Sequence, residues 1–237
     1  YKAQHIILAT GARSRILPNI PQDGKKIIGY REALTLPQLP ESLVVVGSGA
    51  IGSEFAFFYS SLRVKTTIIE LLPTLMPLED EEISKQVERA FRKQGIKIMT
   101  EALVEKVSVV GNQCVLSVKD KKGVIVEMES DVVLSAVGVQ TNIENIGLEE
   151  VGVHTERGKI IVDDYYRTNI EGIYAIGDIV HGPALAHVAS QEAIVCVEKI
   201  AGENPEAVDY KNIPSCTYTT PEVASVGMSE KKAIEEG

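Results

Sequence analysis

The segment from Gly47 to Gly52 constrains this chain more than any other, because its glycines have the spacing Gly-x-Gly-x-x-Gly. It follows an apolar, β-branched run at 43–46 that is typical of a buried parallel strand. Apolar residues then recur every three or four positions from 51 to 62, which predicts one face of a helix. A second strand-like run follows at 66–69. This order predicts a β-α-β unit of about 30 residues and therefore a parallel sheet.

The glycines of this segment have distinct physical roles. Gly47 allows a tight turn, Gly49 lets a pyrophosphate approach the backbone, and Gly52 permits close packing of helix on strand. The helix N-terminus supplies N–H donors and a partial positive charge, so even an acidic protein can bind an anion there. Glu70, which ends the second run, is expected to accept hydrogen bonds from an adenosine ribose and to repel a 2′-phosphate. The pattern predicts a site for NAD rather than NADP; the alternative is a plain strand, turn and helix with an incidental glutamate.

Further segments can be recognised along the chain. Prolines at Pro37 and Pro40 indicate a connector before the β-α-β unit. A helix is predicted to open at the acidic stretch 79–82, whose carboxylates complement the helix dipole on a solvated face, and to end near Gly95. Alternating apolar residues from 104 to 128, with two intervening turns, predict an antiparallel three-stranded meander.

Composition narrows the class of protein. The chain has 237 residues, a formal net charge of −9 and 44% hydrophobic residues, which argues against nucleic acid as the main partner. No apolar run approaches the roughly 20 residues of a membrane span, so no membrane partner is expected. The three cysteines form no Cys-x-x-Cys pair, so a cytoplasmic, reducing setting is expected, with the cysteines as small core residues. The chain starts without Met, and both ends are expected to be cut sites.

Two further strands are predicted to end in small polar turns. The run 6–8 leads into Ala-Thr-Gly at 9–11, which is nonspecific by itself. The run 172–176 ends in Gly-Asp at 177–178, and an aspartate at the carboxyl end of a strand can accept a hydrogen bond from a polyol hydroxyl. Without other information, a Gly-Asp pair is more often only a turn. A helix is predicted from about 185 to 200.

Taken in order, these motifs resemble those of the two-dinucleotide-binding flavoprotein disulfide reductases. The shared pieces are Ala-Thr-Gly at 9–11, the glycine segment with Glu70, and Tyr-Ala-Ile-Gly-Asp at 174–178. Within that family the chain is most similar to the dihydrolipoyl dehydrogenases, on the evidence of Gly-Pro-Ala-Leu-Ala-His at 182–187 and the run 218–227. The resemblance covers essentially the whole chain.

The resemblance implies two cofactors, NAD and FAD. For Glu54, expected in the first helical turn, complementing the helix dipole and contacting the cofactor are equally open. For His187, implied to lie beside the flavin at a helix start, the alternative is a capping or core histidine. The implied NAD residues are Gly47, Ser48, Gly49, Ala50, Ile51, Gly52, Ser53, Glu54, Glu70, Val104 and Gly138. The implied FAD residues are Thr10, Gly11, Ala12, Asp178, Ala184, Leu185, Ala186 and His187.

The chain departs from the family pattern at two places. Residues 139–142 are Val-Gln-Thr-Asn, where the family often has an arginine and then a proline. Arg63 takes a position where such helices commonly end in glycine, so a distorted or differently capped helix end is expected. The family's Cys-x-x-x-x-Cys redox pair and His-Glu base dyad do not occur in this sequence. No catalytic residue and no metal ligand is therefore assigned within it.

The resemblance implies an α/β fold in which one domain is inserted into another. A Rossmann-like NAD-binding domain, made of a parallel sheet plus a three-stranded antiparallel meander, interrupts an FAD-binding domain of which only parts are present. The expected segments are 1–35 for the first FAD part, 41–142 for the NAD-binding domain, 143–208 for the returning FAD part and 209–237 for the start of an interface domain.

The implied activity of the parent protein is FAD-dependent oxidation of protein-bound dihydrolipoamide, with the hydride passed to NAD. The implied partners are a lipoyl group on an acyltransferase or carrier protein of a 2-oxo acid dehydrogenase or glycine cleavage complex, and a second copy in a homodimer. For this segment alone we expect NAD binding, weak or no FAD retention and no turnover. The alternatives are a sibling reductase of the glutathione or mercuric reductase type, and a non-catalytic NAD-binding module.

Overall fold

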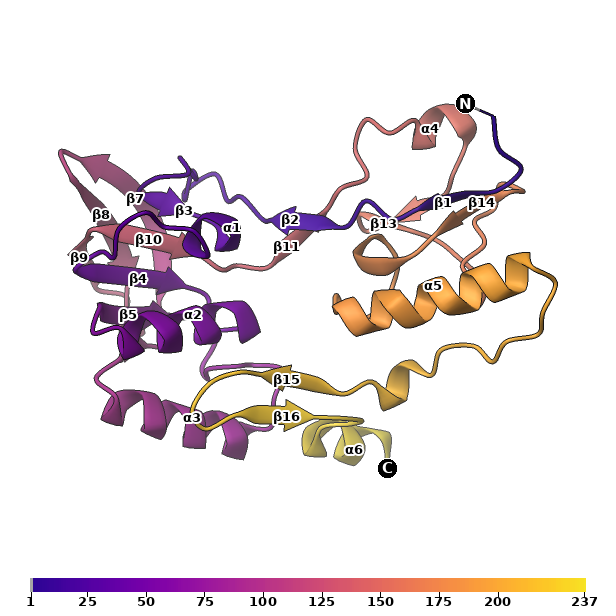
Figure 1. The fold of residues 1–237 in the computed structure, drawn as a ribbon. Coiled ribbons are helices and arrows are strands. Elements are labelled where there is room, and N and C mark those ends of the chain that lie inside the picture. The colour runs from indigo at the N-terminus through magenta and orange to yellow at the C-terminus, as the bar shows by residue number, and fades with distance from the viewer. Residues whose placement is uncertain (1) are drawn as a thin grey trace. The chain divides into compact units, whose positions relative to one another are not determined.

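The computed structural model describes residues 2–237, which separate into two compact units. Unit 1 comprises the described residues up to Arg13 together with Val139–Ile213. Unit 2 comprises Ser14–Gly138 together with Pro214–Gly237. Figure 1 labels most of the helices and strands of both units. Each unit is therefore assembled from two stretches of chain that lie far apart in the sequence.

A parallel five-stranded sheet forms the centre of unit 2, as the β-α-β pattern predicted. Its strand order is β3-β10-β4-β5-β6. The central strand β4 pairs with both neighbours in parallel, with Val44 opposite Val133 and Val45 opposite Ile68. The strands are β3 (Ile27–Ile28), β4 (Ser42–Val46), β5 (Lys65–Ile69), β6 (Lys97–Met99) and β10 (Val132–Ser135).

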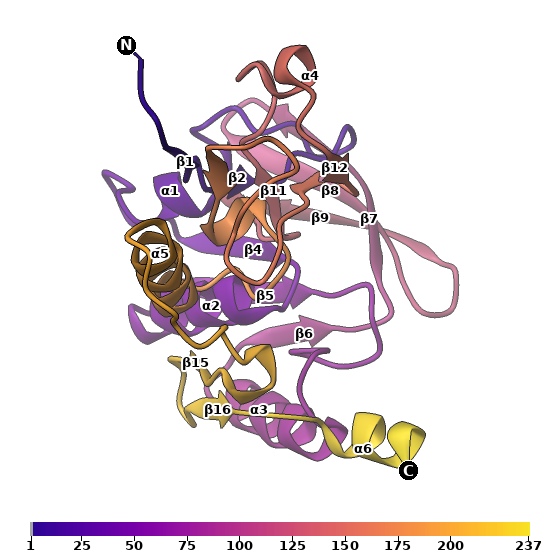
Figure 2. The ribbon, with the colours of Figure 1, turned by 90° about the vertical axis from the view of Figure 1, so that its right-hand side faces the viewer.

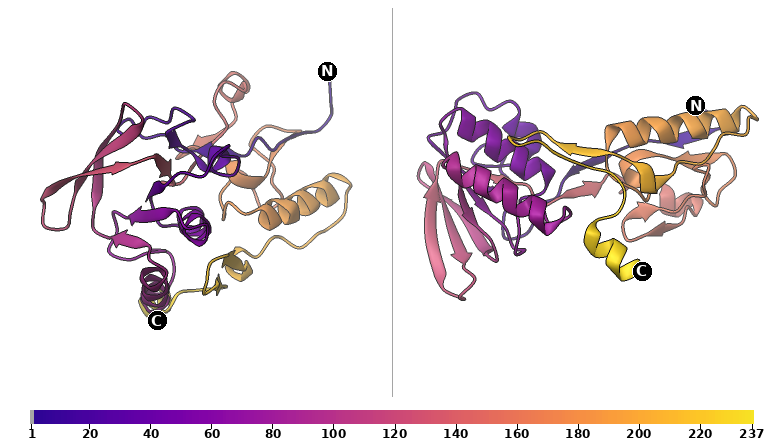
Figure 3. Two further views of the ribbon diagram at one scale, coloured as in Figure 1. Left: turned by 60° about the vertical axis from the view of Figure 1, so that its left-hand side comes forward. Right: turned by 90° about the horizontal axis from the view of Figure 1, so that it is seen from below.

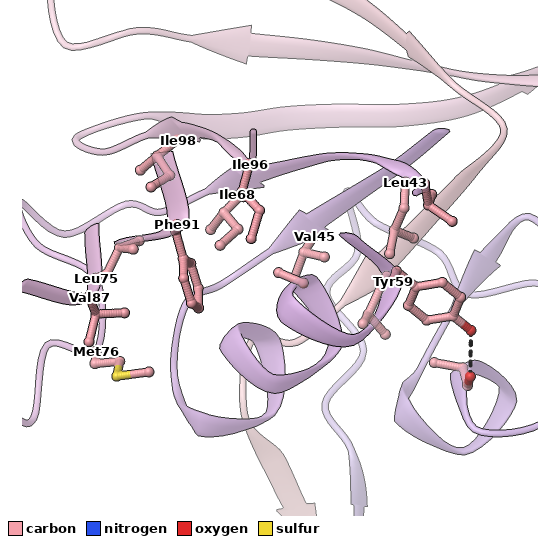
Figure 4. Packing of buried hydrophobic residues seen from close by; sticks show 14 of the residues in the cluster. Leu43, Val45, Tyr59, Ile68, Leu75, Met76, Val87, Phe91, Ile96 and Ile98 are labelled. Atoms are coloured by element: carbon pink, nitrogen blue, oxygen red, sulfur yellow. Dashed lines mark hydrogen bonds between the residues drawn. The ribbon is translucent and has the colours of Figure 1, made fainter. Parts of the chain in front are cut away.

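Helices of unit 2 cover one face of this sheet. Val45 and Ile68 point into a core with Tyr59 and Phe91, which the helices contribute, as Figure 4 shows. The Tyr59 hydroxyl is satisfied inside this core, because it donates to the Ala33 carbonyl at 2.6 Å. The helices are α1 (Tyr30–Ala33), α2 (Ala50–Ser61) and α3 (Glu81–Lys93).

The expected three-stranded antiparallel meander covers the other face of the sheet. Val44 and Ile69 alternate with the residues that face the helices, and they pack with Val107 and Leu116 of the meander. Sheet and meander together confirm the predicted α/β fold class. The meander strands pair in the order β7 (Leu103–Val110), β8 (Gln113–Lys119) and β9 (Ile125–Ser130).

A C-terminal hairpin packs on the helices of unit 2. The Gln94 side chain at the end of α3 donates to the Thr220 carbonyl at 2.9 Å, and the Ser225 hydroxyl donates to the Glu79 carboxylate at 3.3 Å. Figure 2 shows the hairpin beside α3, and the view from below in Figure 3 shows it also running along α2. Its elements are β15 (Ser215–Thr217) and β16 (Val223–Ser225), followed by α6 (Glu230–Glu236).

The unit boundaries differ from the expected segments at both ends of the chain. Residues 14–35, expected with the first FAD part, belong to unit 2, because β3 pairs with β10 and Ile20 lies in the core under the meander. Residues 214–237 also belong to unit 2 through the hairpin, whereas 209–213 belong to unit 1. Contacts between distant segments therefore place residues 14–35 and 214–237 in the same compact unit.

The end of α2 corrects the expectation of a distorted helix terminus. Arg63 adopts a left-handed backbone with φ of 67°, its N–H donates to Ser60, and the Val64 N–H donates to Tyr59. These are the two hydrogen bonds of a Schellman motif, the same pair that Gly95 and its successor make at the end of α3. The cap is regular, and arginine occupies the position that glycine takes in α3.

Unit 1 is built on two parallel strands and one long helix. β1 pairs with β14, with Ile7 opposite Tyr174, and Tyr174 packs with Val195 and Cys196 of α5. Strand β2 (Ala12–Ser14), in which the boundary with unit 2 falls, pairs with β11 (Val139–Thr141). The other elements are β1 (Ile6–Leu8), α4 (Leu148–Val151), β12 (Thr155–Glu156), β13 (Lys159–Ile160), β14 (Ile173–Ala175), the 3₁₀ turn η1 (Gly177–Ile179), α5 (Ala186–Ile200) and η2 (Tyr210–Asn212).

Helices in the described part of the chain are all too short or too polar to cross a lipid bilayer.

Candidate functional site

The turn between β4 and α2 requires glycine at two positions for different reasons. Gly47 has φ of 98°, and a Cβ there would lie 2.5 Å from the Ala136 carbonyl oxygen. A Cβ at Gly52 would lie 2.0 Å from the Gly47 carbonyl oxygen, far inside any allowed contact. Gly52 therefore lets the first turn of α2 pack directly on the turn that precedes it, as the sequence predicted.

Gly49 differs from its neighbours because nothing crowds it. It is the N-cap of α2, with φ of −63° and ψ of −175°, and no atom lies within 4 Å of the position a Cβ would take. Its carbonyl accepts the first helical hydrogen bond, from the Ser53 N–H at 2.9 Å. The absence of a side chain leaves the helix N-terminus accessible to an anion, which is the role expected of Gly49.

Glu70 is held in place by three hydrogen bonds. Its Oε2 accepts from the Ser48 N–H at 2.8 Å and from the Ser48 hydroxyl at 2.7 Å. Its Oε1 accepts from the Leu72 N–H at 2.8 Å. A carboxylate has about four acceptor directions, so one remains for a ligand hydroxyl. The role of the Ser48 hydroxyl was missed, because the spacing of the motif says nothing about what reaches Glu70 from the turn.

One cavity joins the glycine turn to Glu70. It has a volume of about 580 Å³, a size typical of small-molecule sites, and lies wholly within unit 2. Of the expected NAD residues, the cavity is lined by Gly47, Ser48, Gly49, Glu70, Val104 and Gly138. Ala50, Ile51, Gly52, Ser53 and Glu54 are not in its lining.

Residues outside the glycine motif complete the cavity. Arg15 brings a positive charge to the lining, opposite in sign to Glu70, and its N–H donates to the Gly138 carbonyl at 3.0 Å. Sequence analysis missed it, since nothing in the spacing connects residue 15 with residue 138. The lining residues that were not predicted are Arg15, Leu17, Asn19, Ile20, Val46, Ile69, Leu71, Leu72, Ala102, Leu103, Ala136 and Val137.

Glu54 and Ser53 make contacts inside the protein. Glu54 Oε1 accepts the Tyr218 N–H at 2.8 Å and so ties the C-terminal hairpin to α2. The prediction that Glu54 lies in the first helical turn was wrong, because α2 has no acidic residue there. Ser53 is buried, and its hydroxyl donates to the Ser48 carbonyl at 2.9 Å. This hydrogen bond holds the turn in shape.

In unit 1, the segment from Thr10 to Ala12 is hydrogen-bonded to Asn142, which lies in the stretch that departs from the family pattern. The Thr10 hydroxyl donates to the Asn142 carbonyl at 2.6 Å, and the Asn142 side-chain amide donates back to the Thr10 carbonyl at 3.0 Å. The Asn142 N–H also donates to the Gly11 carbonyl at 2.8 Å. Asn142, the last residue of the departing sequence, therefore fixes the turn that follows β1.

The second expected FAD segment follows β14, the neighbour of β1. Asp178 is half-buried in the turn η1, which starts directly after β14. Helix α5 begins at Ala186 with Leu185 as its N-cap, so His187 lies in the first helical turn, exposed. An exposed side chain excludes the core alternative for His187, and the N-cap position belongs to Leu185. Because β1 and β14 are parallel, their carboxyl ends lie at one edge of the same ribbon.

The cysteines differ in burial. Cys114 and Cys196 are buried, and desolvation raises the pKa of each thiol to about 11, so both are protonated and unreactive at neutral pH. Their interpretation as core residues is confirmed. Cys216 is exposed, so the same interpretation was wrong for it. Within residues 2–237, no three His, Cys, Asp or Glu side chains come together as a metal site would require.

Comparison with known proteins gives one family match and similarity to named enzymes along the whole of this chain. A family profile described as "Pyridine nucleotide-disulphide oxidoreductase" matches residues 1–193. A curated dihydrolipoyl dehydrogenase from Rhizobium etli is 51% identical over 238 residues, which cover 100% of this chain and 50% of that protein. The chain thus spans about half the length of the curated relatives it matches.

Two solved structures share the fold. LpdA from Mycobacterium tuberculosis has 31% sequence identity and a TM-score of 0.91, covering 100% of this chain and 51% of its own. The HOCl-induced flavoprotein disulfide reductase RclA from Escherichia coli has 30% identity and a TM-score of 0.87, covering 98% of this chain and 53% of its own.

Proposed function

This chain belongs to the pyridine nucleotide-disulphide oxidoreductase family, and we propose that its unit 2 binds NAD at the turn between β4 and α2. The proposal rests on one observation: Gly47, Gly49 and Glu70 line the same cavity. The turn offers a helix N-terminus to a pyrophosphate, and Glu70 keeps one acceptor direction for a ribose hydroxyl. The negative carboxylate disfavours a 2′-phosphate, so NAD is preferred over NADP.

The remaining expected NAD residues divide between contact and support. Val104 and Gly138, both in the lining, are proposed to lie beside the adenosine and nicotinamide parts of NAD. Gly52 and Ser53 support the turn from behind, since one permits close packing and the other donates to the Ser48 carbonyl. Glu54 is proposed to support the NAD site indirectly, through the C-terminal hairpin that it anchors.

Unit 1 is proposed to hold part of FAD. The residues fit such a group, because Thr10 to Ala12 and Asp178 follow two neighbouring parallel strands at their carboxyl ends, where α/β proteins bind ligands. Asp178 would accept from the ribityl chain or lie near the pyrophosphate, and residues 184–187 would lie against the flavin. FAD, when bound, supplies the hydride-transfer chemistry.

The proposed activity of the whole protein is oxidation of protein-bound dihydrolipoamide with delivery of a hydride to NAD. The residues of this chain bind and orient NAD and exclude water from it. The proposed partners are a lipoyl group carried by an acyltransferase or carrier protein of a 2-oxo acid dehydrogenase or glycine cleavage complex, and a second copy in a homodimer. The proposed location is the cytoplasm.

Calorimetric titration with NAD and NADP tests the NAD site. We expect the unaltered protein to prefer NAD, and Glu70→Arg to lose NAD affinity while the preference over NADP shrinks. Because Glu70 is buried, Glu70→Gln provides a second, milder variant, and Glu198→Arg on the exposed face of α5 is the matched charge control. An unchanged cofactor preference in both Glu70 variants would remove Glu70 from the site.

A sibling disulfide reductase is the second candidate, favoured by the structural similarity to RclA. The two candidates differ in the electron donor or acceptor that exchanges with the flavin. Rates with lipoamide and with glutathione disulfide, measured with NADH on the protein as its gene encodes it, separate them. NAD binding without reduction of either disulfide would instead indicate a non-catalytic NAD-binding module.

A further inference from the structure

We propose that Glu192 is a positioning residue that fixes the turn carrying Asp178 and thereby sets the affinity of unit 1 for FAD. This inference rests on the proposed role of unit 1 in holding FAD. Glu192 belongs to α5, outside every segment that the sequence motifs singled out. Its role follows from a hydrogen-bond chain that joins three distant parts of unit 1.

Glu192 connects α5 to the turn after β14. Its side chain is 1% exposed. The Gly177 N–H donates to Oε2 at 2.5 Å, and the Tyr210 hydroxyl donates to Oε1 at 2.7 Å. Gly177 directly precedes Asp178, so the carboxylate holds the backbone that aims the Asp178 side chain. Because both donors point toward Glu192, the arrangement suits an ionised carboxylate.

The series of hydrogen bonds continues from Tyr210 to Tyr166, a residue in a strained backbone conformation. Tyr166 is buried and has φ of 66°, a left-handed backbone that a bulky residue adopts only when its surroundings impose it. Its hydroxyl lies 3.0 Å from the Tyr210 hydroxyl, and its carbonyl accepts the Ala175 N–H at 3.0 Å. Strained backbone of this kind concentrates where a precise geometry serves function.

The far end of the same loop is also held. Lys159 in β13 donates to the Val180 carbonyl at 2.7 Å and to the Gly182 carbonyl at 3.4 Å. A Cβ at Gly182 would lie 2.7 Å from Cε1 of the Tyr210 ring, so the loop packs closely against that side chain. The loop from 177 to 182 is therefore held at both ends and packed against Tyr210.

Burying the Glu192 carboxylate between α5 and the turn after β14 costs free energy. Desolvation raises the pKa of Glu192 and outweighs the hydrogen bonds from Tyr210 and Gly177, which lower it. An apolar residue would pack there without that penalty, but it would leave the Gly177 N–H unpaired and the Tyr210 hydroxyl with only the Tyr166 hydroxyl as partner. The carboxylate is thus matched to two donors, one of which belongs to the turn that carries Asp178. Such support determines how well a binding group is preorganised.

The test compares variants of the protein as its gene encodes it, with FAD as the probe. We expect Glu192→Ala to raise the FAD dissociation constant about 30-fold and to alter the visible circular dichroism of the bound flavin. Glu192→Gln can still accept from Gly177 through its amide oxygen, so it should stay within about threefold of the unaltered protein. Tyr210→Phe should weaken FAD binding about threefold. Glu198→Ala, on the exposed side of the same helix, is the matched control and should change nothing.

Hydrogen exchange of the β14 and α5 amides reports whether unit 1 of a variant is folded, and NAD affinity reports the same for unit 2. A Glu192→Ala protein that binds NAD normally, with FAD affinity and flavin dichroism also unchanged, would overturn the positioning role. If Glu192→Ala does not fold, Tyr210→Phe decides: an FAD dissociation constant equal to that of the unaltered protein would overturn the role. Failure of the unaltered protein to bind FAD at all would instead overturn the proposed function of unit 1.

Discussion

Two strand-to-helix connections, one in each unit, build their turns by different means. In unit 2, β4 ends at Val46 and α2 begins at Ala50, so the turn is short and its shape comes from glycine backbone. In unit 1, β14 ends at Ala175 and α5 begins at Ala186, and the longer loop is held by side chains that reach it from other elements. Glu192 is the main example, through its bond to Gly177.

Because of this difference, the two sites are sensitive to different substitutions. A turn made by glycines fails when a methyl group is added where backbones already touch, as at Gly47 and Gly52. A loop held by side chains fails when a distant hydrogen-bonding group is removed, because a buried donor is left unpaired. Adding methyl groups to both turns should therefore affect unit 2 more than unit 1.

The largest effect is expected for Gly52→Ala. The new Cβ would lie 2.0 Å from the Gly47 carbonyl oxygen, so α2 must move away from the turn, at a cost of about 3 kcal/mol. Hydrogen exchange of the β4 and α2 amides measures this cost, with the α5 amides of unit 1 as an internal reference. Exchange rates equal to those of the unaltered protein would show that the turn is not closely packed.

Gly49→Ala should separate binding from stability in the same turn. No atom lies within 4 Å of the new Cβ, so stability should fall by less than about 1 kcal/mol, the usual range for a changed N-cap. NAD affinity should fall by about 30-fold, or about 2 kcal/mol, because the methyl group occupies the approach of the pyrophosphate. Scanning and titration calorimetry measure the stability and the NAD affinity of this variant. Unchanged NAD affinity would place the pyrophosphate elsewhere.

Gly177→Ala is the counterpart in unit 1. Its Cβ would meet Ala189 at 3.4 Å, which is tolerable, so the cost comes from the left-handed backbone with φ of 75° and should be about 1–2 kcal/mol. Hydrogen exchange of the β14 and α5 amides gives the value. A cost above that of Gly52→Ala would reverse the comparison between the two turns.

The smallest effect is expected for Arg63→Gly, away from both turns. Arg63 holds the left-handed position that Gly95 holds in α3, with the same two hydrogen bonds. The Arg63→Gly substitution should stabilise unit 2 by about 1 kcal/mol without changing NAD affinity. The Gly95→Arg substitution should have the opposite effect on stability. Thermal unfolding curves, together with hydrogen exchange of the α2 and α3 amides, would detect either change. A destabilised Arg63→Gly protein would contradict the account of the cap.

Sequence reasoning succeeded where the determining contacts are local. The β-α-β unit, the meander and the roles of Gly47 and Gly52 were all predicted from periodicity and spacing over a few residues. It failed at Glu54, whose partner Tyr218 lies on a hairpin far along the chain, and at Arg63, where a regular cap tolerates arginine. It also missed Arg15, whose backbone N–H is paired with the distant Gly138 carbonyl at the cavity.

The glycine turn and the acidic residue after the second strand follow from the order of residues alone, because backbone angles and close backbone approach depend on consecutive residues. That the Ser48 hydroxyl holds Glu70, and that Glu192 and Tyr210 hold the turn before Asp178, is a result of folding. Those hydrogen bonds join residues that are separated by many positions. Their partners are chosen by how the strands and helices pack, which no spacing pattern records.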